Sequence, residues 1–204
     1  MELGTWLAFM AAAAVVLAIP GPTILLVIGQ SLGAGRRGAW KLVAGVAAGD
    51  AVAMTLSLAG LGALLATSAT AFTVLKFAGA AYLVWLGVKL WRAPVTDATD
   101  ATPRPAWQAA REAFLVTALN PKSIAFFVAF VPQFIVADRP FLAQAAVLVP
   151  SFVLMAAANA ALYALLAARM SGAVRKPRVR RWINRTGGSV LIGAGAATAL
   201  MRRA

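Results

Sequence analysis

The sequence predicts an all-α membrane protein with six transmembrane helices, arranged as two inverted three-helix repeats in which helices 1 and 4 are broken. Three observations carry this prediction. Hydrophobic residues make up 62% of the 204 residues and charged residues only 12%, with a mean hydropathy of +0.83. A soluble domain of this size could not bury so much apolar surface. Six long apolar runs follow one another, and proline interrupts the run that opens each half of the chain.

Each apolar run has roughly the 20 residues that a helix needs to cross the hydrocarbon core of a bilayer. The runs cover residues 5–28, 41–66, 69–91, 113–137, 141–168 and 184–203. We expect one transmembrane domain over residues 1–204, with a first half (1–92), a linker (93–111) and a second half (112–204). Because Glu2 stands where a signal peptide has basic residues, we expect the first run to be a retained helix.

The basic residues predict the orientation in the membrane. Lys and Arg outnumber Asp and Glu by 19 to 6, which in a soluble chain would suggest nucleic-acid binding. Here the cations gather after the first, third and fifth runs, as at Arg36, Arg104 and Arg178, so no nucleic-acid partner is expected. The positive-inside rule therefore predicts that these three loops are cytoplasmic and that both termini lie outside.

An odd number of helices in each half would make the two halves enter the membrane from opposite sides, as inverted repeats require. The third and sixth runs share a weak pattern, in which Lys76 and Gly79 match Arg185 and Gly188. Coincidence in a sequence rich in glycine and alanine is the alternative. The pattern Gly45-x-x-x-Gly49 allows close helix packing and favours contacts within the bundle, with a homodimer face as the alternative.

The two interruptions indicate where a substrate would bind. They are Pro20-Gly21-Pro22 in the first run and Asn120-Pro121-Lys122 in the fourth. Interrupted hydrophobic segments in matching places of two halves are typical of the substrate site of a secondary transporter. We therefore interpret the chain as a small secondary transporter.

Both interruptions have features of a helix start. Asn120 is a good N-cap and Pro121 a good first helical residue, and Gly21 followed by Pro22 can begin a helix in the same way. Helix N-termini present free N–H groups and a partial positive charge, which suit a carboxylate. The alternative is a pair of prolines that only bend the helices.

Asp50 is the only acidic residue inside an apolar run. A charge at that depth costs at least ~2.5–3.5 kcal/mol, so the side chain is expected to face the bundle interior. It would bind a proton or a substrate ammonium group, or form a structural ion pair with Lys122. Pro22, Asp50, Pro121 and Asn159 fall at one depth, ~6 Å to the cytoplasmic side of the midplane. This predicts a cavity lined by helices 1, 2, 4 and 5, in which Asp50 and the two helix starts would match a zwitterion.

Several reaction classes are excluded by composition. The chain has no Cys and no His, which rules out thiol relays, imidazole proton shuttles and Cys/His metal sites. The sequence shows no nucleophile–base arrangement, phosphate loop or metal-ligand set. We therefore expect no enzyme activity, no catalytic residues, no metal site and no cofactor.

Stretches along nearly the whole chain resemble one family, the LysE/RhtB amino-acid exporters of bacteria. The stretches are, in order, Pro20-Gly21-Pro22-Thr23, Gly33-x-Gly35-Arg36-Arg37-Gly38, Gly45-x-x-x-Gly49-Asp50, Leu75-Lys76-x-x-Gly79-Ala80-x-Tyr82-Leu83-x-x-Leu86-Gly87, Asn120-Pro121-Lys122 with Phe126-Phe127 and Pro132-Gln133-Phe134, and residues 181–195. The resemblance implies a multi-pass exporter of the bacterial plasma (inner) membrane, driven by the proton gradient. Its motifs look closer to the homoserine/threonine branch than to exporters of basic amino acids.

Together these features favour export of a small, neutral amino acid or derivative by proton antiport, with the substrate, protons and the lipid bilayer as partners. A single intramembrane acid gives no second anion for a cationic side chain, and the basic loops would repel a cation. The alternatives are a divalent-cation exporter, which would need more oxygen or nitrogen ligands, and a membrane assembly subunit without transport. The expected substrate-binding residues are Pro20, Gly21, Pro22, Thr23, Asp50, Asn120, Pro121, Lys122 and Asn159.

Overall fold

The computed structural model describes residues 1–67, 69–93, 105–136, 138–174 and 177–200. Over these residues the regular structure is entirely helical. The elements are α1 (Leu3–Ala18), α2 (Pro22–Thr67), α3 (Ala69–Trp91), α4 (Ala106–Ala118), α5 (Pro121–Ala125), the π-helical turn η1 (Phe126–Phe130), the 3-10 turn η2 (Val131–Phe134), α6 (Phe141–Val174) and α7 (Pro177–Leu200).

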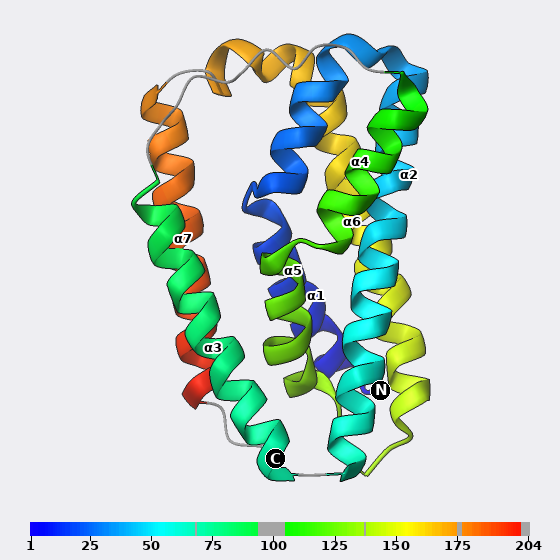
Figure 1. Ribbon diagram of the computed structural model, residues 1–204, viewed down its shortest axis with the longest axis vertical. Helices are drawn as coiled ribbons and strands as arrows, with labels where there is room; N and C mark the ends of the chain where they lie inside the picture. Colours follow the sequence, from blue (N-terminus) through cyan, green and yellow to red (C-terminus); the bar gives the residue numbers. More distant parts are fainter. Residues whose placement is uncertain (68, 94–104, 137, 175–176, 201–204) are drawn as a thin grey trace.

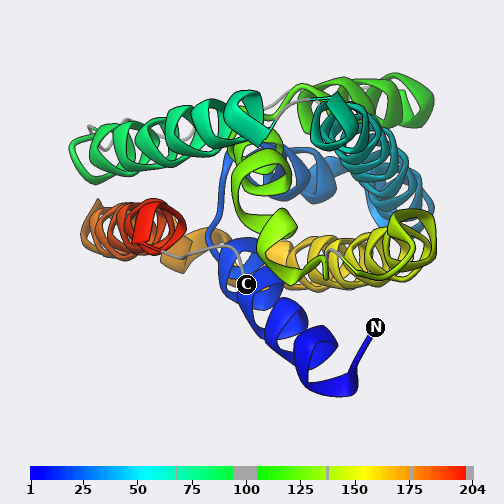
Figure 2. The same cartoon turned by 90° about the horizontal axis from the view of Figure 1, so that it is seen from below.

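The helices form an elongated bundle with two groups (Figure 1). α2 packs against α4 and α6, and α3 packs against α7 as an antiparallel pair. α5 lies between the two groups, and α1 leans outward from the middle of the bundle, as Figure 2 shows along the bundle. α1 begins and α7 ends at the same end of the molecule, and the turn of α2 lies at the other end.

The prediction of six spans is confirmed only in part. Over the described residues, three segments are long and apolar enough to cross a membrane: Gly38–Gly62, Ala106–Phe134 and Phe141–Leu166. α1 and the segment Pro22–Ser31 meet at an angle of 59° and make a fourth if they count as one broken span.

Helix limits differ from the predicted runs because helix continues beyond the apolar residues. α2 is assigned as one helix from Pro22 to Thr67, where we expected a loop after residue 28; in Figure 1 it turns over at one end of the bundle and runs back. No proline follows Pro22 within this stretch, so every residue after it can donate its backbone hydrogen bond. α4 likewise begins at Ala106, inside the predicted linker, because Ala, Gln, Arg and Glu there favour a helix.

The glycine pattern of α2 packs within the bundle, as predicted. A Cβ at Gly49 would lie 2.7 Å from Phe114 O and 2.8 Å from Thr117 Cβ, and one at Gly45 would collide with the backbone of Ala110. Gly45 and Gly49 therefore let α2 and α4 approach closely, as small residues do in membrane helix pairs.

Gly49→Ala is expected to destabilise the protein by about 1–3 kcal/mol, because its Cβ meets backbone and Cβ atoms that cannot move aside easily. Gly60→Ala is a matched control in the same helix, since a Cβ at Gly60 meets nothing within 4 Å. We expect the control to be neutral or stabilising by up to about 1 kcal/mol, because alanine favours helix over glycine. Thermal unfolding in detergent measures both variants, and equal melting temperatures would contradict the proposed packing.

Candidate functional site

The first break lies between α1 and α2. α1 ends at Ala18, Ile19 takes an extended conformation (φ −79°, ψ 111°), and α2 begins at Pro22. A proline disfavours helical geometry in the residue before it, so Pro20 forces Ile19 out of the helix. The prediction that a helix begins at Pro22 is confirmed.

The second break repeats this geometry. Asn120 precedes Pro121 and has φ −69° and ψ 111°. Its side-chain Oδ1 accepts a hydrogen bond of 3.0 Å from the backbone N–H of Lys122, and Pro121 is the first residue of α5. The predicted N-cap at Asn120 and helix start at Pro121 are both confirmed.

A buried polar network joins the two breaks. Thr23, in the first turn of α2, accepts hydrogen bonds at its Oγ1 from Asn120 Nδ2 (3.2 Å) and from Thr117 Oγ1 (3.3 Å). All three side chains are buried. The starts of α2 and α5 are therefore held side by side, although about 100 residues separate them in the sequence.

Three side chains from the second half of the chain satisfy the carbonyl groups at the end of α1. Lys122 Nζ donates to Ile19 O (2.8 Å) and Val16 O (3.1 Å). Asn159 Nδ2 donates to Leu17 O (3.1 Å), and the Tyr163 hydroxyl donates to Ala18 O (3.1 Å). The last carbonyls of a helix lack partners within it and carry partial negative charge. Inside a membrane they need such donors.

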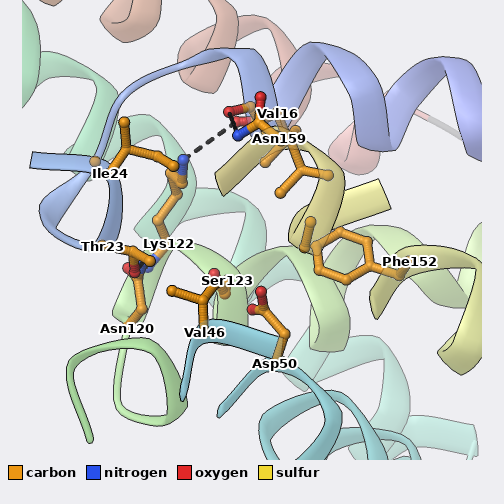
Figure 3. A pocket seen from close by; sticks show the side chains of 13 residues that line it. Val16, Thr23, Ile24, Val46, Asp50, Asn120, Lys122, Ser123, Phe152 and Asn159 are labelled. Carbon is orange, nitrogen blue, oxygen red and sulfur yellow. Dashed lines mark hydrogen bonds between the residues drawn. The ribbon is translucent and has the colours of Figure 1, made fainter. Parts of the chain in front are cut away.

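The Asp50 carboxylate is buried, with 3% of the residue exposed, and points toward the cavity shown in Figure 3. Among the described residues it has no hydrogen-bond partner and makes no ion pair within 4 Å. The structural ion pair with Lys122, one of the two readings of the sequence, is therefore not formed. Lys122 lines the same cavity and acts on Asp50 electrostatically across it.

The cavity has a volume of about 30 Å³. Six of the predicted site residues line it: Gly21, Thr23, Asp50, Asn120, Lys122 and Asn159. Pro20, Pro22 and Pro121 are not among its lining residues and act through the backbone conformation of the breaks. The lining residues come from α1, the two breaks, α2, α5 and α6. These are the regions in which we expected a cavity from the shared depth of Pro22, Asp50, Pro121 and Asn159.

Sequence reasoning missed the apolar wall of the cavity, formed by Ile24, Val46, Phe152 and Ala156. It also missed the hydroxyl of Ser123 and the end of α1 at Val16 and Leu17. Helical spacing could have found three of them. Val46 lies four residues before Asp50, and Phe152 and Ala156 lie seven and three residues before Asn159.

Aromatic packing supports the Phe152 side of this wall. The Phe152 ring meets the fully buried Phe127 ring edge-on, with centroids 4.9 Å apart, and also packs against Phe126 at 5.9 Å. Such aromatic pairs contribute beyond the apolar area that they bury. These contacts hold the Phe152 ring at the cavity from two sides.

The fold and the site define a helical membrane protein in which two broken helices meet at a small cavity lined by both polar and apolar side chains. The chain belongs to the LysE type translocator family, which matches residues 14–202. This is a family of transporters and not of enzymes.

Curated relatives agree with this assignment. A homoserine/homoserine lactone efflux protein of Salmonella typhimurium is 34% identical over 100% of both chains. A membrane protein of Vibrio cholerae, described as uncharacterized, is 38% identical over 96% of both chains. A leucine efflux protein of Klebsiella pneumoniae is 35% identical over 64% of this chain and 63% of its own. No solved structure matches the chain significantly.

Proposed function

We propose that this protein exports a small, neutral amino acid or derivative from the cytoplasm across the bacterial inner membrane, by proton antiport. The observation that carries the proposal is the Asp50 carboxylate, which lines a cavity between two broken helices and has no hydrogen-bond partner among the described residues. A buried acid of this kind can take up a proton or hold a substrate ammonium group. Ionisable residues within membranes usually line transport pathways.

The opposite side of the cavity suits a carboxylate. The α2 start presents the amides of Thr23 and Ile24, which precede the first residue that donates within the helix, Leu25. Lys122 has three N–H hydrogens and uses two of them on α1. Helix amides and Lys122 would meet the carboxylate end of a zwitterion; if Asp50 binds the substrate and not the coupling proton, Asp50 would meet the ammonium end.

The apolar wall supports an uncharged side chain. Ile24, Val46, Phe152 and Ala156 offer no partner to a second charge, and Asp50 is the single acid among the cavity's lining residues. The relatives named for homoserine and leucine efflux favour the same substrate class. A divalent-cation exporter is the weaker candidate, because such ions take six or more oxygen ligands.

The present cavity must open to admit an amino acid. Its volume of about 30 Å³ suits contents the size of a water molecule. In the proposed cycle the two halves rock about the site, opening it to one side at a time. The paired placement of α2 with α6 and of α3 with α7 supports two related halves.

Efflux from proteoliposomes with an imposed proton gradient tests this function. Vesicles loaded with labelled homoserine, leucine or lysine are compared with and without the gradient. We expect gradient-dependent release of at least one neutral amino acid and none of lysine. Release of lysine alone would contradict the substrate class, and release that ignores the gradient would contradict antiport. A non-transporting assembly subunit would release none of them.

The proposed orientation predicts a labelling pattern in this naturally Cys-free chain. Cysteines that replace Arg36, Asp100 or Arg178 are expected to be cytoplasmic, and those that replace Ser68 or Asp138 external. A membrane-impermeant thiol reagent applied to intact cells distinguishes the two groups. Labelling of the cysteine at 178 from outside would contradict the orientation.

A further inference from the structure

Lys122 differs from the other two donors at the end of α1 because it carries a positive charge. Asn159 and Tyr163 offer neutral hydrogen bonds to Leu17 O and Ala18 O. The Lys122 ammonium bridges Val16 O and Ile19 O, and so spans the last turn of α1 and the first residue of the break. Its position depends on the charges around it as well as on these carbonyls.

The one anionic group among the residues that line the cavity is Asp50. It lies across the cavity from Lys122 and lacks a hydrogen-bonded partner within the described residues. A charged carboxylate attracts an ammonium group more strongly than neutral carbonyls do. The lysine side chain is long and flexible, and on one side Nζ faces Gly21, which has no side chain to hold it in place. The ammonium therefore has two competing partners.

We propose that Lys122 is a positioning residue that transmits the charge state of Asp50 to α1. While a proton or a substrate ammonium neutralises Asp50, Lys122 stays on the carbonyls of α1 and ties the end of that helix to α5. When Asp50 is charged and empty, it draws Lys122 away and releases the end of α1. This inference rests on the proposed function, because it gives Asp50 the role of the group whose charge changes during transport.

Few charged groups face this site. α2 contributes Asp50, α5 contributes Lys122, and α6 contributes the neutral hydroxyl of Tyr163. α1 carries no charged side chain between Leu3 and Ala18. Raising the pH removes the proton from Asp50, and we expect the end of α1 to lose its hydrogen bonds to Lys122. Lowering the pH is expected to restore these hydrogen bonds.

A cysteine at the end of α1 reports this movement. Ile19 is buried, so Ile19→Cys in the Cys-free full-length protein is expected to react slowly with a small water-soluble thiol reagent while α1 is held. In substrate-free proteoliposomes the rate is divided by that of Asp138→Cys, an exposed position, to correct for the pH dependence of an exposed thiol. The same cysteine in the Asp50→Asn background corrects for the pKa of the buried thiol itself. We expect the normalised rate to rise several-fold as the pH is raised.

Three further variants complete the experiment. With Asp50→Asn, Ile19→Cys is expected to stay protected at every pH, and with Lys122→Met it is expected to react fast at every pH. Lys122→Arg keeps the charge and is expected to restore protection at low pH. Tyr163→Phe removes a neutral hydrogen bond and is expected to raise the rate equally at all pH values.

Two outcomes would overturn the inference: a pH dependence that survives in Asp50→Asn, or a protected cysteine in Lys122→Met. Asp50→Asn is nearly isosteric, so the test stands even if Lys122→Met fails to fold. The labelling needs no transported substrate. If the proposed function is wrong, efflux is absent while the labelling rates change with pH as expected. If this inference is wrong, efflux is normal while the labelling rate of Ile19→Cys is the same with Asp50 and with Asn at that position.

Discussion

Replacing Asp50 with Asn is expected to abolish net efflux driven by the proton gradient. The amide has the shape of a protonated carboxyl group but cannot release a proton, so the variant cannot complete an antiport cycle. Exchange of labelled for unlabelled substrate needs no proton release, and we expect it to continue. Proteoliposomes with substrate on both sides measure the two activities separately.

The controls give each outcome one meaning. Glu2→Gln removes an acid that pairs with Arg139 at the surface, at 2.9 Å, and should leave efflux near the wild-type rate, because exposed ion pairs contribute little. Loss of exchange together with efflux from Asp50→Asn would assign Asp50 to the substrate ammonium instead. Wild-type net efflux from this variant would contradict both roles and leave Asp50 a structural residue.

Replacing Pro121 with Ala is expected to bring export close to background while the protein still inserts into the membrane. Pro121 keeps Asn120 in its extended conformation (ψ 111°), and this conformation separates α4 from α5. With alanine the two helices can join, which would move the amides and Lys122 away from the cavity.

Pro150→Ala is the matched control for this prediction. Pro150 lies inside α6, on an exposed face, and does not line the cavity. We expect this variant to export at a rate similar to the wild type. If Pro121→Ala also exports at a rate similar to the wild type, proline at the second break only bends the chain. The proposed carboxylate site at the start of α5 would then be wrong.

The sequence predicted the features that depend on near neighbours. A proline restricts the residue before it, and an asparagine side chain reaches the amide two residues later, so both breaks could be located from Pro20-Gly21-Pro22 and Asn120-Pro121 alone. The inward placement of Asp50 was also predictable, because lipid exposure of a charge is too costly.

What the sequence could not predict depends on groups that meet only in the folded chain. An ion pair between Lys122 and Asp50 was the alternative reading of the sequence, since opposite charges attract. Lys122 instead binds the backbone carbonyls of Val16 and Ile19. Every residue has a carbonyl group, so the sequence does not mark these two, and they are available only because α1 ends there. The predicted limits of α2 and α4 were wrong for another reason. Hydropathy indicates which residues can lie in lipid, whereas backbone hydrogen bonds determine where a helix begins and ends.

The donors at the end of α1 bear on how the protein is made. Lys122, Asn159 and Tyr163 all belong to the second half of the chain, and so do Thr117 and Asn120, which hold Thr23. During synthesis the first half enters the membrane before any of them has left the ribosome. Until they arrive, the carbonyls of the first break must be hydrated or shielded by the insertion machinery, because lipid offers no donors. The first break therefore gains its full set of hydrogen-bond partners only when residues up to Tyr163 have been inserted.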